Sequence, residues 1–223
     1  MAWRSSGSTN EALVENLFRN HLITSARVKE AMLKVDRAHY APTAPYKDSP
    51  QTIGHHATIS APHMHAAACE SLLPYLTSGA RVLDVGSGSG YLTHVLAELI
   101  APGGKVVGIE HIAALVDLAR ANLVKSEGGK AFLEEGRVGF VKGDGRLGWL
   151  EMAPYDAIHV GAAAVEFHEA LIGQLKAPGR LFMPVEEDFR QHIYVVDKDA
   201  EGHVTRTKTI GVQYVPLTDE PRG

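Results

Sequence analysis

The sequence is poor in cysteine and lacks long apolar runs. Cys69 is the only cysteine among 223 residues, so no disulfide can form within the chain, and we expect a reducing compartment, the cytoplasm. No apolar stretch approaches the ~18 residues needed to cross a bilayer. Residues 1–8 include no apolar segment, so we expect no secretory signal and no membrane partner.

An excess of charge of one sign is absent as well. The formal net charge is −4, the pI is near 6.3 and no basic stripe is visible, so we expect no nucleic-acid partner. The 22 glycines follow no fixed period, which excludes collagen-like and repeat folds. With 45% hydrophobic residues, the composition is that of a globular protein, which we expect to be a monomer.

The pattern of apolar residues changes near residue 80. Before it, helical spacing occurs over residues 11–20 and 28–35, and a third helix is predicted from Pro62 to about Leu76. Residues 41–50 contain three prolines and are expected to be irregular. We expect residues 1–80 to form a helical N-terminal extension that carries part of a substrate site. Residues 81–223 are expected to form the core of the same globular unit.

From Arg81 onward, predicted strands and helices alternate. The strands are expected at residues 82–85, 105–109, 138–141, 157–160 and 180–184, and the helices at 91–100, 113–125 and 166–175. This alternation predicts βαβ units in an α/β fold with a mostly parallel sheet. Ile193–Val196 and Thr205–Val215 have no helix between them, which predicts a C-terminal antiparallel hairpin at the sheet edge.

A glycine-rich loop, Asp84–Gly90, lies between the first predicted strand of the core and its helix. Alternate glycines allow a close approach of backbone to ligand, and this end of a parallel sheet is where α/β proteins bind ligands. Tyr91 stands where the dinucleotide fingerprint requires its third glycine, and no phosphate-loop Gly-Lys-Ser/Thr follows. Asp84 would repel phosphate and suits a positively charged ligand. The loop residues predicted to bind the cofactor are Asp84, Gly86, Ser87, Gly88 and Ser89.

Acidic residues also follow the next two predicted strands. Glu110 ends the second strand, where a carboxylate can accept hydrogen bonds from both ribose hydroxyls. Gly143 and Asp144 end the third, where a carboxylate or neighbouring backbone can meet an adenine amino group. Each acid could instead cap a helix. Three acids beside one glycine loop favour a nucleoside site, and S-adenosyl-L-methionine, an adenosine joined to a cationic amino acid, satisfies all of them.

Several segments together resemble the protein-L-isoaspartate (D-aspartate) O-methyltransferase family. They are residues 36–40 (DRAHY), 57–65 (ATISAPHMH), the loop 84–90, residues 143–146 (GDGR) and residues 154–163 (PYDAIHVGAA). The resemblance covers nearly the whole chain, and segment 57–65 is more specific than the glycine loop, which marks methyltransferases in general. It implies a Rossmann-like class I S-adenosylmethionine-dependent methyltransferase fold, with residues 81–223 as its core.

The resemblance also implies an activity and a set of site residues. The activity is methylation of the free carboxylate of L-isoaspartyl and D-aspartyl residues in age-damaged proteins, which leaves S-adenosyl-L-homocysteine. The methyl ester then collapses to a succinimide. Ser60 corresponds to the family's active-site serine. The cofactor contacts implied by the resemblance fall on Ala57, Thr58, Ile59, Ser60, His65, Ser89, Glu110, Gly143, Asp144 and Thr218.

The chemistry of the residues is consistent with this activity. A carboxyl group is ionised at neutral pH and needs orientation rather than a general base, and we find no Ser-His-Asp or Cys-His arrangement. The Ser60 hydroxyl can donate a hydrogen bond to the attacking carboxylate. It is equally well placed to cap the helix that contains Pro62, so the residues alone leave both roles open.

Histidines 55, 56, 63 and 65 lie close together in the sequence, but their spacing matches no metal-binding motif, so we expect no metal. The chain also departs from the family pattern. His55-His56 stands where relatives commonly have an aromatic residue and glutamine, and the acidic segment Glu186–Phe189 replaces a glycine-rich one. These departures leave the peptide preference open.

Three other functions remain as alternatives. The same cofactor site could serve methylation of a small metabolite or of RNA, although RNA binding would call for a basic surface. A non-catalytic cofactor-binding protein is a second alternative, against which the presence of Thr58, Ile59 and Ser60 argues. A nicotinamide-dependent oxidoreductase is the third, and Tyr91 disfavours it.

Overall fold

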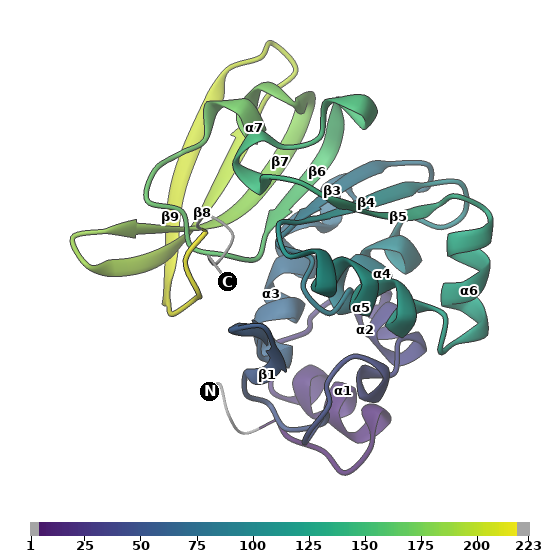
Figure 1. Ribbon diagram of the computed structural model, residues 1–223. Coiled ribbons are helices and arrows are strands. Elements are labelled where there is room, and N and C mark those ends of the chain that lie inside the picture. Colours follow the sequence, from purple (N-terminus) through teal and green to yellow (C-terminus); the bar gives the residue numbers. More distant parts are fainter. Residues whose placement is uncertain (1–4, 218–223) are drawn as a thin grey trace.

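The computed structural model describes residues 5–217 and has a seven-stranded sheet at its centre (Figure 1). The strand order is β5-β4-β3-β6-β7-β8-β9. Strands β3 to β7 pair in parallel, β8 pairs antiparallel with β7, and β9 pairs antiparallel with β8. The bounds are β3 Arg81–Val85, β4 Lys105–Glu110, β5 Val138–Lys142, β6 Tyr155–Val160, β7 Leu175–Glu187, β8 Arg190–Lys198 and β9 Val204–Val212. The predicted α/β class and its antiparallel edge are confirmed.

The predicted helices are present in the predicted order, with differences in length, and the helix Glu127–Glu134 was not predicted. The helices are α1 Asn10–Arg19, α2 Ala26–Lys34, α3 Pro62–Leu72, α4 Tyr91–Leu99, α5 Ala113–Leu123, α6 Glu127–Glu134 and α7 Glu169–Gly173. The helix predicted over residues 166–175 is too long, because residues 165 and 166 form a bend, the helix begins only at Glu169, and Leu175 already belongs to β7. Helix α3 stops at Leu72 and a 3₁₀ turn, Leu73–Tyr75, follows.

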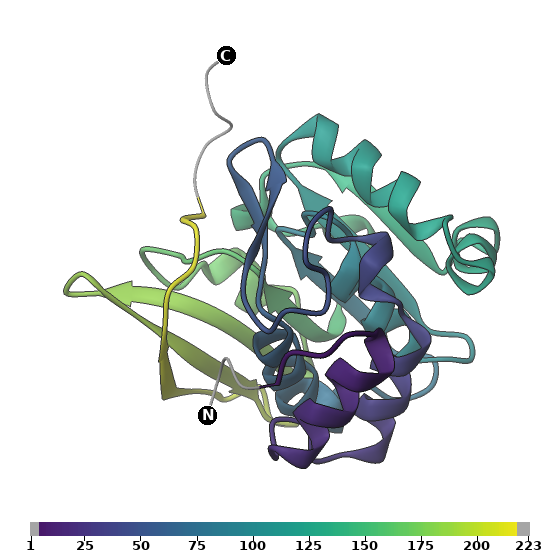
Figure 2. The ribbon, with the colours of Figure 1, turned by 90° about the horizontal axis from the view of Figure 1, so that it is seen from below.

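A small hairpin was not predicted. Strands β1 (Gln51–Gly54) and β2 (Ala57–Ile59) pair antiparallel, and His55 and His56 form the turn with positive φ angles of 52° and 58°. Such a turn favours asparagine or glycine, so two histidines gave no hairpin signal in the sequence. Seen from below, the hairpin projects as a narrow finger beside the sheet (Figure 2).

The central strands β3, β4 and β6 are buried on both faces, which explains their continuous apolar runs. Adjacent residues of one strand point to opposite faces, so Val82 packs with the N-terminal helices while Leu83 packs with α7. In β4, Val106 likewise packs in the cluster of the N-terminal helices and Val107 in the cluster that contains α7. The first cluster contains residues of α1 to α6, so the N-terminal extension and the sheet share one hydrophobic core. Among residues 5–217, no helix is both long and apolar enough to cross a membrane.

Gly108, in the middle of β4, gives the glycine loop room to pack. A Cβ at this position would lie 2.8 Å from Phe140 Cδ1 and 2.8 Å from Ser87 Cβ. Gly108→Ala is therefore expected to lower the free energy of unfolding by about 1–3 kcal/mol, because the loop and the ring must both move. Urea unfolding measures this change. Gly139→Ala is the matched control in the neighbouring strand, since a Cβ there meets nothing within 4 Å; equal losses in the two variants would contradict the packing argument.

Candidate functional site

Two adjoining cavities lie at the carboxyl ends of the parallel strands. They share four lining residues, which are Thr58, Gly86, Gly88 and Gly161. The inner cavity is lined by Thr58, Ile59, Ser60, His65, Asp84, Gly86, Ser87, Gly88, Ser89, Tyr91, Leu92, His159 and Gly161. The outer cavity has a volume of about 260 Å³ and includes Ala57, Glu110, His111, Ile112, Leu115, Ala162 and Val215–Leu217 in its walls. Most of the predicted cofactor residues are therefore brought to one place.

Three predicted cofactor residues are not part of this site as described. Gly143 and Asp144 line neither of the two cavities. The Asp144 carboxylate instead accepts the Arg146 backbone N–H at 3.0 Å and forms a bidentate ion pair with the Arg146 guanidinium. This is the capping role that the sequence left as the alternative. Thr218 lies outside the described residues.

The glycine loop leaves a hydroxyl ready for a ligand. Gly86 and Gly88 have φ angles of +74° and +51°, which residues with side chains rarely adopt, so the shape of this loop depends on glycine. Ser87 Oγ is buried, yet it has no hydrogen-bond partner among the described residues. A buried hydroxyl without a partner is costly, so the loop fits a polar ligand that supplies one. S-adenosylmethionine is a polar ligand of this kind.

Asp84 lies in the inner cavity wall and is held from two sides. Its Oδ2 accepts a hydrogen bond from Thr93 Oγ1 at 2.6 Å, and its Oδ1 lies 2.8 Å from His159 Nδ1. A carboxylate only accepts, so Nδ1 of His159 carries the hydrogen. His159 was not predicted as a site residue, although β6 pairs with β3 in the register Asp84↔His159. Parallel pairing of the two strand ends was the signal that could have located it.

Glu110 supports the loop from the end of β4. Its Oε2 accepts the Gly88 N–H at 3.1 Å, and its Oε1 accepts the N–H groups of His111 and Ile112 at 2.8 and 3.2 Å. The side chain is only 5% exposed and lines the outer cavity. A carboxylate offers about four acceptor positions, so at least one remains for a ribose hydroxyl. Glu110 therefore holds the loop, and its cofactor role stays a prediction with which this geometry is compatible.

The capping interpretation of Ser60 is wrong. The N-cap of α3 is Ala61, which makes no side-chain cap, and Pro62 is the first helical residue. Asp48 caps the helix from outside, since its Oδ1 accepts the His63 N–H at 3.1 Å and also contacts His63 Nδ1 at 2.7 Å. The Ser60 hydroxyl lines the inner cavity and is not used by the helix.

Tyr214 approaches Ser60 from the end of the chain and was missed in the sequence. Burial raises the pKa of Tyr214 to about 12, and a hydrogen bond with the Ser60 side chain acts in the opposite direction. The backbone of Tyr214 is fixed by Gln191, whose Oε1 accepts its N–H and whose Nε2 donates to its carbonyl at 3.2 Å. Only the folded hairpin β8–β9 brings these distant residues together.

A groove of about 700 Å³ begins beside Ser60. Its walls are the first turn of α3, the β7–β8 turn and the end of β9, with Pro50, Ala61, His63, Met64, Phe189–His192 and Gly211–Tyr214 as the lining. Phe189, at the tip of the turn, is 99% exposed. Of the acidic segment, Glu187 is paired with Lys208 at 2.9 Å and accepts the Tyr194 hydroxyl, so its charge is compensated.

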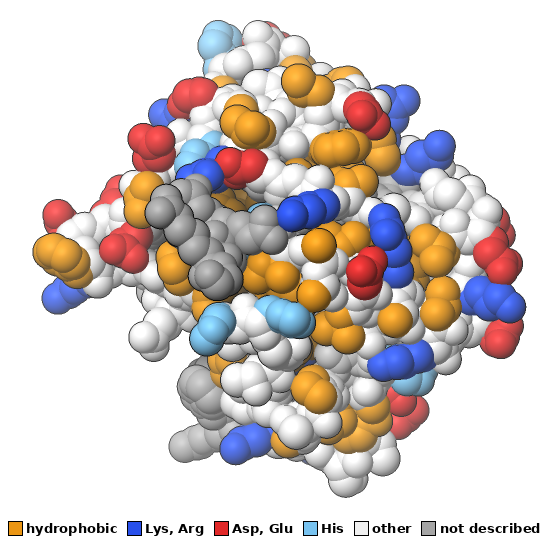
Figure 3. Space-filling view, viewed as in Figure 1, with side chains coloured by type: hydrophobic (Ala, Val, Ile, Leu, Met, Phe, Trp, Pro, Cys, Tyr) orange, Lys and Arg blue, Asp and Glu red, His pale blue; other side chains and the backbone are white. Residues whose placement is uncertain are grey.

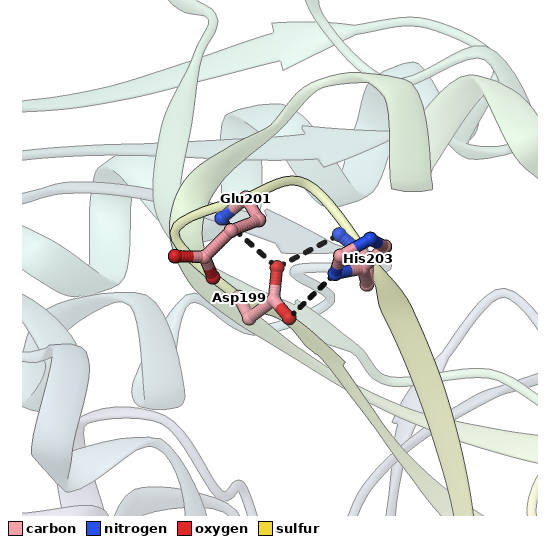
Figure 4. Close-up of side chains that lie close together, drawn as sticks. All are labelled: Asp199, Glu201 and His203. Atoms are coloured by element: carbon pink, nitrogen blue, oxygen red, sulfur yellow. Dashed lines mark hydrogen bonds and ion pairs between the residues drawn. The ribbon is translucent and has the colours of Figure 1, made fainter.

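One cluster of side chains has the composition of a metal site. Asp199, Glu201 and His203 lie together in the β8–β9 turn, and all three are exposed (Figure 4). Asp199 accepts hydrogen bonds from the backbone N–H groups of Glu201 and His203 and from His203 Nδ1. These bonds organise the turn. Within residues 5–217, histidines 55, 56, 63 and 65 form no cluster of this kind.

Known proteins match the chain over almost its whole length. The sequence model of the protein-L-isoaspartate(D-aspartate) O-methyltransferase family matches residues 8–222. The protein-L-isoaspartate O-methyltransferase of Caenorhabditis elegans is 50% identical over 219 residues, which are 98% of this chain and 96% of that protein. Protein-L-isoaspartate O-methyltransferase 1 of Arabidopsis thaliana is 49% identical over 216 residues, 96% and 93% of the two chains.

A solved structure agrees with the same assignment. A Plasmodium falciparum protein, assigned as a protein-L-isoaspartate O-methyltransferase and crystallised with S-adenosyl-L-homocysteine, superposes with a TM-score of 0.87 at 34% identity. The match covers 95% of this chain and 99% of the other. Fold, cavity residues and sequence similarity agree, and the chain belongs to the protein-L-isoaspartate(D-aspartate) O-methyltransferase family.

Proposed function

We propose that this protein methylates the free carboxylate of L-isoaspartyl and D-aspartyl residues in damaged proteins, a proposal that the names of its family and relatives support. The observation that carries the proposal is the position of the Ser60 hydroxyl, which lines the cofactor cavity beside the mouth of the groove and is free of any capping role. S-adenosyl-L-methionine, when bound, supplies a methyl group on a positively charged sulfur. The substrate carboxylate is the nucleophile and needs no general base.

The residues of the cavity hold and orient the two reactants. Gly86–Ser89 and Glu110 are proposed to hold the nucleoside, with Ala57 and Thr58 in the opposite wall. Asp84, fixed by Thr93 and His159, places negative charge where a cationic ligand is stabilised. The Ser60 hydroxyl donates to the arriving carboxylate and fixes its direction. Orientation of this kind lowers barriers by up to roughly 7–11 kcal/mol.

The groove beside Ser60 is proposed to hold the peptide that flanks the damaged residue. It runs between α3 and the β7–β8 turn and opens to the surface, as an extended segment of a protein substrate requires. Tyr214, with its backbone fixed by Gln191, lies between the groove and Ser60 and is the second hydroxyl near the substrate carboxylate. The exposed ring of Phe189 provides apolar surface for a flanking side chain.

We also propose that the protein acts as a monomer in the cytoplasm and without nucleic acid. The buried, unpaired Cys69 supports a reducing compartment. Positive and negative side chains are mixed over much of the face in Figure 3, which supports a partner other than nucleic acid. The division of the chain into residues 1–80 and 81–223 stays a proposal about roles, with residues 51–65 contributing to the substrate side.

The decisive test uses two peptides that differ only in one linkage. We expect the protein, given labelled S-adenosyl-L-methionine, to form a base-labile methyl ester on an isoaspartyl peptide and none on the same peptide with normal aspartate. Released methanol measures the ester. No ester on either peptide, together with calorimetric binding of the cofactor, would instead support a non-catalytic binding protein. Methylation of a metabolite or an RNA alone would favour the other alternative.

A further inference from the structure

Arg37 is a fully buried arginine in contact with the site. It lies in a 3₁₀ turn, Arg37–His39, after α2, and its exposed fraction is 0%. Within residues 5–217 no carboxylate is in ion-pair contact with the guanidinium, although the charge of the nearby Asp48 acts to raise the Arg37 pKa, and Nε has no hydrogen-bond partner there. Burying a cation without a carboxylate in contact is costly. Burial also lowers the pKa of Arg37 to about 10, at which the side chain is still charged at neutral pH.

The partners that Arg37 does have are two residues of the cavity wall. One terminal nitrogen, Nη2, donates to the Ser60 carbonyl at 2.7 Å. The other, Nη1, lies 3.2 Å from Nδ1 of His65. The guanidinium also lies over the ring of Tyr91, 5.1 Å from its centroid. Ser60, His65 and Tyr91 all line the inner cavity, so one buried side chain connects three parts of its wall.

The contact with His65 fixes where that imidazole carries its hydrogen. Arginine has five N–H donors and no acceptor, so Nδ1 of His65 must accept. A ring that accepts at Nδ1 is neutral and carries its hydrogen on Nε2. Burial and the nearby Arg37 charge hold the pKa of His65 well below its usual value, which agrees with a neutral ring. The ring therefore offers the cavity a single donor, the Nε2–H.

We propose that Arg37 is a positioning residue for methyl transfer, which locks His65 in the Nε2–H tautomer and holds the Ser60 carbonyl, so that two donors face the reactants in a fixed arrangement. The inference rests on the proposed function. The positive charge of Arg37 adds a second effect, because both the amino-acid end of S-adenosyl-L-methionine and the substrate bring a carboxylate to this cavity. A buried cation beside them stabilises each anion more than a solvated one would.

The tautomer is measured directly by ¹⁵N NMR of protein labelled at histidine, without ligand. His65→Gln assigns the signals of His65 by their loss. We expect the unaltered protein to show a protonated Nε2 and a bare Nδ1. In Arg37→Met the donor is gone, and we expect the Nδ1–H form to become populated; in Arg37→Lys the ammonium replaces the donor and restores the original pattern. Arg27→Met, which removes an arginine that donates to the carbonyls of Leu76 and Leu99, should leave His65 unchanged.

Kinetics then separate positioning from a structural role. Arg37→Met is expected to lower kcat about tenfold, and Arg37→Lys to recover part of the loss. A hydrogen on Nδ1 of His65 in the unaltered protein overturns the proposal. So does Arg37→Met with an unchanged His65 signal. If Arg37→Met does not fold, the His65 tautomer seen in the spectra of the unaltered protein and of Arg37→Lys still tests the proposal. Absence of methyl-ester formation by the unaltered protein refutes the proposed function instead, since the spectra need no substrate.

Discussion

Ser60→Ala is expected to reduce kcat for an isoaspartyl peptide by about 10- to 100-fold while the affinity for S-adenosyl-L-homocysteine changes little. The size follows from losing one hydrogen bond to a charged group, about 1.5–3 kcal/mol, in a site where direction is the main contribution to catalysis. The structure adds a second expectation. Since Ala61 is the N-cap of α3 and makes no side-chain cap, the helix should be unaffected, and the thermal midpoint should fall only by the loss of the hydrogen bond with Tyr214. Steady-state kinetics, calorimetry and thermal unfolding provide the three readouts.

The control for Ser60→Ala is another hydroxyl with a defined partner. Ser78 donates to the Pro102 carbonyl at 2.8 Å and lines neither cavity, so Ser78→Ala should leave kcat unchanged. If Ser60→Ala lowered stability and cofactor affinity in the same proportion as kcat, the hydroxyl would be a structural element and the proposed orientation of the carboxylate would have to be abandoned.

The grouping of the predicted cofactor residues around one pair of cavities was predictable because it depends on local sequence. The loop Asp84–Gly90 lies between an apolar run and a helical pattern, and parallel strands bring their carboxyl ends to one edge. Glu110 was placed by the same reasoning. Asp144 shows where this reasoning stops, because the neighbouring Arg146 donates hydrogen bonds to its carboxylate. Sequence spacing alone does not show which partner an acidic side chain takes.

The substrate side was less predictable because it is built from long-range contacts. Tyr214 reaches Ser60 only after β8 and β9 have extended the sheet, and His159 meets Asp84 only through strand pairing. Arg37 belongs to the segment 36–40 that resembles the family, but its burial and its contact with His65 depend on how α2 and α3 pack. The turn of the short β1–β2 hairpin consists of two histidines with positive φ angles. Histidine does not predict this conformation, so the hairpin could not be found from the sequence.

Glu110→Ala is expected to raise the Kd for S-adenosyl-L-homocysteine by about 10- to 100-fold. Two contributions act together. The carboxylate loses a charge-assisted hydrogen bond to the ribose, about 1.5–3 kcal/mol, and the N–H groups of Gly88, His111 and Ile112 lose their acceptor. Water can enter the outer cavity and satisfy part of that loss, so the increase stays within this range. Isothermal titration calorimetry measures the change.

A second ligand separates the two roles of Glu110. The analogue of S-adenosyl-L-homocysteine with a 2′-deoxyribose lacks one hydroxyl, so the unaltered protein should bind it more weakly than the parent ligand. In Glu110→Ala the two ligands should bind almost equally, because the acceptor that distinguishes them is gone. If Glu110→Ala weakened both ligands by the same factor, the carboxylate would only hold the loop. Glu98→Ala, which removes a partly buried glutamate paired with Lys34 at 3.1 Å, is the control and should leave both affinities unchanged.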